Sequence, residues 1–357
     1  MANAYLRFLL VAFAIILNNS CVQGGRNLAR KGTIKTIQSK DGDIIDCVDI
    51  YKQPAFDHPL LKNHKIQVFS SPQRFIPSQW NQEKQESVVR QTWHESGECP
   101  EGTIPIRRST TSTPVRRSTS SLASTPFPYS IQPNFSFRGE PYEVDPKRYG
   151  DKKTRLFIYW TTTSYRQGCF DLECPGFVQL SSKYALGSDI YPLSSYDGPQ
   201  YDTTVHIEQD LQTGSWHLFF QGSALGYWPG SLVPAMKNGA AGVQWGGQVT
   251  NLRSGDRHTT TQMGSGHFAR AGFQKASFVR LLQVIIDGEA RDPENIDTQV
   301  SNVFCYDLHV AIRDSDYGFH FFYGGPGLQS HCNNNFRIDS LHSQLDLDDR
   351  IVIPRSI

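Results

Sequence analysis

The chain has almost no excess charge of either sign, because 35 lysines and arginines stand against 34 aspartates and glutamates, and the net charge is +1. This balance gives no reason to expect either a nucleic-acid-binding surface or an acidic partner. After residues 8–17 no apolar run is long enough to span a bilayer. No repeat of about 20–50 residues is present, which excludes solenoids and propellers.

Spacings typical of metal ligands are also missing. The histidines are scattered along the chain, and the Cys-x4-Cys spacing of Cys169 and Cys174 has no second pair to match it. Zinc is therefore the weaker alternative to a disulfide for these two cysteines. We expect no metal and no cofactor.

The first 24 residues have the pattern of a secretory signal. Arg7 supplies a positive start, residues 8–17 form a short apolar core, and Val22 and Gly24 precede a plausible cut after Gly24. A membrane anchor is the alternative interpretation. We expect the signal to be removed and the protein to be secreted, extracellular and free of the membrane.

Seven cysteines are present, and Cys21 would leave with the signal. An even number then remains, which in a secreted chain indicates disulfides, with fifteen possible pairings. Asn134-Phe135-Ser136 is the N-glycosylation sequon of the mature chain, so Asn134 is the expected glycan site.

Aromatic residues make up 12% of the chain, with 29 glycines and 20 prolines, which favours short strands and turns over long helices. Alternating runs at 203–208 and 216–220 predict a hairpin. Many short strands indicate an all-β fold, an antiparallel β-sandwich. Other predicted strands are 33–37, 44–48, 155–160, 242–249, 278–286 and 319–323, with one helix at 82–93 and a helical turn at 231–237.

Composition divides the chain into a signal, a small mixed domain, a linker, a sandwich and a polar tail. The expected boundaries are 1–24, 25–106, 107–133, 134–332 and 333–357. The linker is rich in Ser, Thr and Pro, which predicts an exposed segment. Its basic pairs, Arg107-Arg108 and Arg116-Arg117, are either processing sites or solvated charge. The acidic tail is expected to be poorly ordered.

Residues 225–249 carry two aromatic–glycine motifs, Gly226-Tyr227-Trp228-Pro229 and Trp245-Gly246-Gly247-Gln248-Val249. Flat rings beside glycines suit a shallow groove in which another backbone lies close to the floor. The candidate groove residues are Tyr227, Trp228, Trp245, Gly246 and Gly247, whose rings would pack on proline. The alternative is a Trp-Gly β-bulge within a sandwich core.

Five further motifs follow one another along the chain: Asp41-Gly42-Asp43, Cys99-Pro100-Glu101-Gly102, Cys174-Pro175-Gly176-Phe177, Gln262-Met263-Gly264-Ser265-Gly266 and Tyr323-Gly324-Gly325-Pro326-Gly327. With the two aromatic motifs, they make the chain resemble the neprosin family of plant secreted proteins. These are glutamic peptidases with prolyl specificity, made with a signal and an activation peptide. The resemblance covers about residues 32–110 and 142–332.

The resemblance implies that residues 25–106 are a removable inhibitory pro-domain; an N-terminal domain that is never cleaved is the alternative. Together with order along the chain, it favours three disulfides, Cys47–Cys99, Cys169–Cys174 and Cys305–Cys332. It also implies a monomer that acts on a peptide or protein substrate containing proline.

A glutamic peptidase needs one ionised carboxylate to activate water and one protonated carboxyl to donate a proton, which places its activity at acid pH. In the family one catalytic Glu closes a Trp-Gly-Gly-Glu-Val motif, and Gln248 stands at that position here. An amide can donate and accept hydrogen bonds but cannot act as a general base.

The second catalytic Glu of the family precedes a Tyr-Gly-Asp motif. Counting back from Tyr149-Gly150-Asp151 places that position on Gly139, with Glu140 one residue out of register. In a strand such a shift turns the side chain to the other face, unless a bulge at Gly139 restores it. Glu140 and Gln248 are therefore the candidate catalytic pair.

Residues 109–138 are also shorter and less patterned than the family would lead one to expect, so the sandwich is expected to lack strands. A degenerate paralogue and a mispredicted gene model remain alternative explanations. Two functions follow: a prolyl glutamic endopeptidase with weakened or lost activity, or a non-catalytic extracellular module that binds proline-rich peptides or cell-wall glycoproteins.

Overall fold

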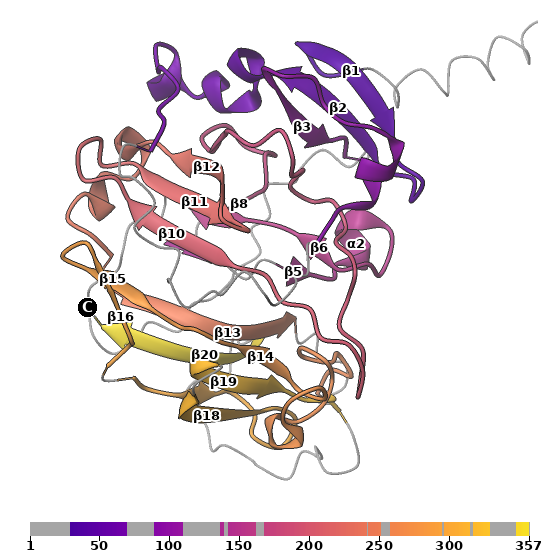
Figure 1. Cartoon of the computed structure of the whole chain (residues 1–357), viewed down its shortest axis with the longest axis vertical. Coiled ribbons are helices and arrows are strands. Elements are labelled where there is room, and N and C mark those ends of the chain that lie inside the picture. The colour runs from indigo at the N-terminus through magenta and orange to yellow at the C-terminus, as the bar shows by residue number, and fades with distance from the viewer. Residues whose placement is uncertain are drawn as a thin grey trace, which may run out of the picture.

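The computed structural model describes residues 29–69, 89–109, 136–138, 142–161, 168–240, 242–250, 258–294, 296–314, 317–328 and 348–356. Over these residues the strands are short, their pairings are antiparallel, and the helices are single turns (Figure 1). The expected all-β fold class is confirmed.

The strands are β1 Thr33–Gln38, β2 Ile44–Asp49, β3 Thr103–Arg107, β4 Ser136–Arg138, β5 Tyr142–Glu143, β6 Arg155–Leu156, β7 Tyr159–Thr161, β8 Gly168–Phe170, β9 Val178–Gln179, β10 Val205–Gln209, β11 Trp216–Phe220, β12 Ser223–Trp228, β13 Gly242–Thr250, β14 Ser277–Val279, β15 Val284–Ile286, β16 Glu289–Arg291, β17 Gln299–Val300, β18 Asp307–Asp314, β19 Gly318–Gly324 and β20 Asp348–Ser356. The helical turns are η1 Ile50–Lys52, η2 Pro54–Asp57, η3 Pro59–Leu61, η4 Thr92–Ser96, α2 Pro146–Tyr149, η5 Gly230–Leu232, η6 Pro234–Met236 and η7 Ala269–Ala271.

Strands β1, β2 and β3 form a sheet of their own at one end of the molecule (Figure 1). Ile45 and Ile104, on neighbouring strands, are fully buried. The predicted disulfide between Cys47 and Cys99 is present and joins β2 to the loop before β3, with a Cα–Cα distance of 5.4 Å.

The sheet β10-β11-β12-β9 lies next along the molecule (Figure 1). Strands β10 and β11 are the predicted hairpin. Trp216, Leu218 and Phe220 alternate along β11 and belong to the largest core cluster, because side chains of one strand alternate between its two faces. The predicted Cys169–Cys174 disulfide lies against this core.

The C-terminal part contains the sheets β13-β20-β17 and β14-β19-β18. Strand β20 pairs with the whole of β13, from Gly242 opposite Ser356 to Thr250 opposite Asp348. Residues 348–356 therefore form a strand, which differs from the poor order that we expected over 333–357; residues 333–347 lie outside the described residues. The run Ile351-Val352-Ile353 is rich in β-branched residues, which suit a strand, and the edge of β13 provides a partner for it.

Two predicted strands are each divided in two. The predicted strand 155–160 becomes β6 and β7, because Ile158 exchanges hydrogen bonds with Asp171: its N–H donates to Oδ1 over 3.0 Å, and its carbonyl accepts from the N–H of Asp171 over 2.8 Å. The predicted strand 278–286 becomes β14 and β15, because Leu281 has a φ of 53°, a left-handed conformation that interrupts a strand.

Residues 89–91 of the predicted helix at 82–93 are not helical in the structure. Trp93 lies in η4, which begins at Thr92 because Gln91 and His94 cap it reciprocally, and residues 82–88 of the predicted helix lie outside the described residues. The expected turn at 231–237 is present as η5 and η6.

The basic pair at the start of the predicted linker is neither solvated nor exposed. Arg107 ends β3 and donates from Nε to Asp43 Oδ1 over 2.8 Å, and Arg108 donates from Nε to Asp46 Oδ2 over 2.9 Å. The side chains of Arg107 and Arg108 are 8% and 14% exposed. Arg155, which follows the predicted linker, also donates to Asp43 over 2.7 Å, so this carboxylate joins segments that precede and follow that linker.

Candidate functional site

The motif residues Tyr227 and Trp228 point to opposite faces of the sheet. Strands β11 and β12 pair so that His217 lies opposite Tyr227 and Trp216 lies opposite Trp228. Trp228 enters the core, where its ring meets that of Phe177 at 4.8 Å. Gly226 is required here, because a Cβ would lie 2.5 Å from the Phe177 ring. Trp228 therefore has the core role that was the alternative to a groove.

Tyr227 takes part in an aromatic surface that we call the aromatic shelf, made of Ser215, His217, Phe219 and Tyr227. The rings of His217 and Tyr227 stack at 4.8 Å with an angle of 17° between their planes. His217 and Phe219 lie two residues apart on β11, so both point to the face opposite the core.

Residues 64–69 cover the aromatic shelf, and we call this segment the strap. The Tyr227 hydroxyl oxygen accepts from the backbone N–H of Gln67 over 2.9 Å and lies 2.8 Å from His64 Nε2. At the other end, the Phe69 ring lies 5.0 Å from His217 and 5.4 Å from Phe219.

The side chain of Gln67 adds a specific polar contact, since the Ser215 hydroxyl donates to its Oε1 over 2.7 Å. Val68, between the two contact residues, is 81% exposed. Contacts at every second residue are typical of an extended segment lying on a surface.

His217 is the unusual group of the aromatic shelf. Its side chain is fully buried, and neither ring nitrogen has a hydrogen-bond partner among the described residues. Burial lowers the pKa of His217 to about 4, although the charges of Asp210 and Glu208 act in the opposite direction. Burial also raises the pKa of Tyr227 to about 12 and lowers that of His64. A neutral imidazole and a neutral phenol thus lie beneath the strap.

The second motif lies in β13, where alternate residues also face opposite ways. Trp245 packs against the core cluster of Leu282, Phe319 and Phe321. Gly247 is buried, and a Cβ on it would lie 2.6 Å from Tyr323. Gln248 is half-buried and, by alternation, shares the other face of the strand with Gly246. Trp245 and Gln248 therefore do not share a face, and the predicted groove residues occupy several environments.

Several predicted site residues lie outside the described residues: Gly139, Glu140, Asn134 and Cys332. The catalytic pair Glu140 and Gln248, the glycan site and the third disulfide partner therefore stay predictions. Cys305 is disulfide-bonded, as expected.

A buried acidic group was not foreseen from the sequence. The Tyr149 hydroxyl donates to Glu143 over 2.5 Å and lies 3.5 Å from Asp171. Burial, and then the charge of Glu143, raise the pKa of Asp171 to about 8, and burial raises that of Glu143. Asp171 holds the backbone of Ile158, so this carboxyl has a structural task. Only the spatial approach of β5, α2 and β8 brings the three groups together.

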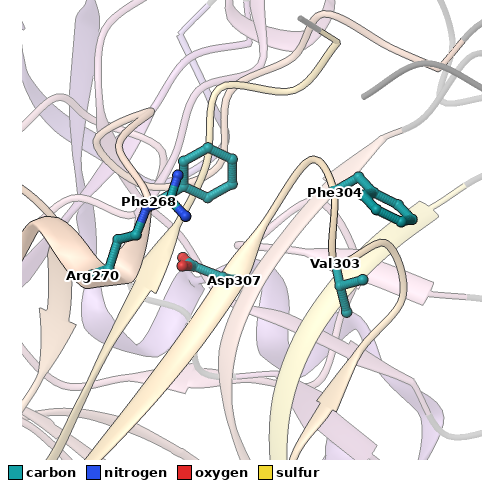
Figure 2. Close-up of a pocket in the computed structure, with 5 residues that line it drawn as sticks. All are labelled: Phe268, Arg270, Val303, Phe304 and Asp307. Atoms are coloured by element: carbon teal, nitrogen blue, oxygen red, sulfur yellow. The ribbon is translucent and has the colours of Figure 1, made fainter. Parts of the chain in front are cut away.

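A hollow of about 290 Å³ lies in the C-terminal part (Figure 2). Figure 2 shows Arg270 and Phe268 near Asp307, with Val303 and Phe304 on a separate loop. Arg270 lies over the Phe268 ring at 4.8 Å, and Asp307 accepts from the backbone N–H of Ala269. None of its lining residues is a predicted site residue, and Asp307, its acidic group, already accepts a backbone hydrogen bond.

Across the described ranges, no group of three or more His, Cys, Asp or Glu side chains could hold a metal ion. No helix in those ranges has the length and apolar character needed to cross a membrane.

The sequence-derived site residues were thus incomplete. His217 and Phe219 were part of the predicted hairpin and Ser215 directly precedes its second run, but the position of His217 opposite Tyr227 follows from the pairing of β11 with β12. The strap residues lie about 160 residues away from Tyr227 in the sequence, and no local pattern links the two; the separations are 163 for His64 and 160 for Gln67.

Comparison with protein families gives two matches that lie one after the other. The family described as Neprosin matches residues 140–326, and the family described as Neprosin activation peptide matches residues 36–134. The strap lies in the second range, and all four residues of the aromatic shelf, which lie in the first range, contact it.

Proposed function

Because the chain belongs to the neprosin family, we propose that it is a secreted, latent protein directed at proline-containing peptides. Its ancestral activity is that of a glutamic endopeptidase working at acid pH, and in this chain that activity is weakened or lost. The mature protein acts as a monomer without metal or cofactor.

The contact between the strap and Tyr227 is the observation that supports latency. An activation-peptide segment makes two polar contacts to a residue of the aromatic motif and covers two neighbouring rings. A substrate approaching this face would have to displace the strap. Removal or opening of residues 64–69 is therefore the step that makes the face available.

The loss of activity is argued from Gln248. Its amide stands where the reaction needs a carboxylate, and an amide cannot take a proton from water at any pH of interest. Glu140 would be the remaining acid. A Glu/Gln pair supports at most a weakened site, by analogy of residue types with the fungal glutamic peptidases.

A non-catalytic binding module is the second candidate function. It is favoured by the strap itself, because a peptide segment already lies on the aromatic shelf and no chemistry is needed for that contact. In this case the uncovered face would bind proline-rich peptides or cell-wall glycoproteins.

A cleavage assay separates these candidates. The secreted protein is held at about pH 3, where Glu carboxyls titrate, and is given a quenched proline-containing peptide. We expect little or no cleavage by the wild type and recovery in Gln248→Glu. Gln244→Glu is the matched control, since Gln244 shares the face of Gln248 on β13.

Rapid cleavage after proline by the wild type, abolished in Glu140→Gln, would overturn the proposal of a weakened site. Failure of Gln248→Glu to recover activity, in a folded protein, would leave binding as the function and would point to the shortened segment 109–138 as the cause.

A further inference from the structure

We infer that the aromatic shelf is a peptide-binding site whose ligand carries an amide side chain followed, two residues later, by an aromatic ring, and that the strap is its own intramolecular ligand. This inference rests on the proposed function and adds the sequence pattern of the peptides that the aromatic shelf would bind. The pattern is read from the occupant that is already in place, Gln67-Val68-Phe69.

The first recognition element is polar. The Ser215 hydroxyl donates to Gln67 Oε1 over 2.7 Å, and the Tyr227 hydroxyl accepts from the backbone N–H of the same residue over 2.9 Å. One residue of the occupant is thus held by both its side chain and its backbone. Asn would be too short by one methylene to reach the same hydroxyl, and an ionised Glu would add a charge beside buried rings.

The second element is aromatic. Phe69 meets the edge of Phe219 at an angle of 79° between ring planes and a centroid distance of 5.4 Å, and it meets His217 at 5.0 Å. Edge-to-face packing of this kind is favourable beyond the area that it buries. An aliphatic side chain would lose that geometry.

The buried imidazole of His217 favours an aromatic ring as the group that covers it. With no hydrogen-bond partner among the described residues and no exposed surface, its two nitrogens lie in an apolar setting that the strap completes. Once Phe69 leaves, water can reach the imidazole, and a second peptide with the same pattern can restore the cover.

The strap contains no proline, so the observed occupant differs from the proline-rich ligand that the aromatic motif suggests. The two ligand classes are distinguishable, because the amide–aromatic pattern depends on Ser215 and Phe219 while proline would need only flat rings.

The test uses a fluorescent peptide with the sequence of residues 62–70. Its binding to the full chain is measured by fluorescence anisotropy at pH 7.5. The wild type should bind it weakly, because the tethered strap competes at a high effective concentration. Phe69→Ala and, independently, Gln67→Ala in the protein should each free the shelf and tighten binding of the peptide about tenfold or more. Val68→Ala is the matched control and should behave as the wild type, since Val68 faces solvent.

Specificity is read from two further peptides, one in which Ala replaces both the Gln and the Phe, and one that is proline-rich. Tight binding of the parent peptide alone supports the inference. No binding to either strap variant, each shown by its circular dichroism and unfolding transition to be folded, would overturn it, and so would equal binding of the doubly substituted peptide. Tighter binding of the proline-rich peptide would overturn the amide–aromatic pattern.

This readout needs no cleavage. Failure here is therefore distinguishable from failure of the proposed peptidase activity, which is measured with Gln248→Glu.

Discussion

The backbone N–H of Gln67 donates a hydrogen bond to the hydroxyl oxygen of Tyr227 over 2.9 Å. One partner lies in the range matched by the activation peptide and the other in the Gly-Tyr-Trp-Pro motif of the range matched by the catalytic family. The strap thus has two proposed roles, because it keeps other peptides off the motif and it has the sequence pattern of the peptides that the motif would bind.

Removal of the Tyr227 hydroxyl should loosen the strap. Tyr227→Phe keeps the ring but loses the contacts to Gln67 and His64. The free energy that favours the closed strap over the open strap should fall by about 1 kcal/mol. Trypsin cleavage after the exposed Lys65 should then become about fivefold faster, because cleavage follows the population of the open form. Tyr196→Phe, at a tyrosine that is 59% exposed, is the control. Equal cleavage rates in all three proteins would count against the strap contact.

Acidification should destabilise the covered state through His217. Its pKa is about 4 when covered and about 6.5 when free, so the covered state binds fewer protons than the open or unfolded state. The contribution of His217 to the stability of the covered state is therefore fully present above about pH 6.5 and is lost as the pH falls toward 4. At pH 5 the loss is about 2 kcal/mol.

Other ionisable groups face the same region, and the comparison must isolate His217 from them. His64 lies on the strap, Tyr227 on β12, and His206, Glu208 and Asp210 on or beside β10. His217→Phe keeps a ring under Phe69 but removes the titrating imidazole. Between pH 7.5 and pH 5, the free energy of unfolding measured in urea should therefore fall by about 2 kcal/mol more in the wild type than in this variant. His309→Phe, an exposed histidine of β18, should follow the wild type. An unchanged pH profile in His217→Phe would contradict the role given to this residue.

Much of this arrangement was predictable from sequence, and the exceptions have physical causes. The alternating runs of β10 and β11 predicted the hairpin, and the Trp-Gly-Gly run predicted a strand in β13. The division of β6 from β7 was not predictable, because it depends on the side chain of Asp171 bonding a distant backbone.

The site was only partly predictable for a similar reason. Tyr227 and Trp228 were both singled out by their motif, and both are buried in the same core cluster. They lie on opposite faces of the sheet, since adjacent residues of a strand face opposite ways, and Tyr227 is the one that contacts the strap. His217 carries no local signal, and its ring contacts Phe69, which lies far away in the chain.

The ion pair between Asp43 and Arg155 should hold the activation peptide to the rest of the protein. The two side chains are 6% and 1% exposed, and after removal of Arg155 the buried Asp43 still keeps its ion pair with Arg107. Arg155→Met should therefore lower the free energy of unfolding by about 1.5–3 kcal/mol, the contribution of a hydrogen bond between charged groups. Lys40→Met, which breaks an exposed pair with Glu95, should cause no resolvable change. Equal stability of Arg155→Met and the wild type in urea unfolding would exclude this role.

Strand β20 should be essential to the sheet around Gln248. Val352 pairs with Gly246 on one side and with Gln299 on the other, so its backbone is central in the sheet. Val352→Pro should cost about 3 kcal/mol and favour association through the exposed edges, as seen by light scattering. Val352→Thr keeps a β-branched side chain and should remain monodisperse. A monodisperse Val352→Pro of unchanged stability would show that β13 does not need this partner.

The most direct measurement of the strap is hydrogen exchange at residues 64–69 in the wild type and His217→Phe, at pH 7.5 and pH 5, corrected for the intrinsic rates. We expect the Gln67 amide to be protected in both proteins at pH 7.5, and to lose this protection at pH 5 in the wild type but not in His217→Phe. A Gln67 amide that exchanges at its intrinsic rate at pH 7.5 would contradict the covered shelf and, with it, both the latency and the recognition pattern proposed here.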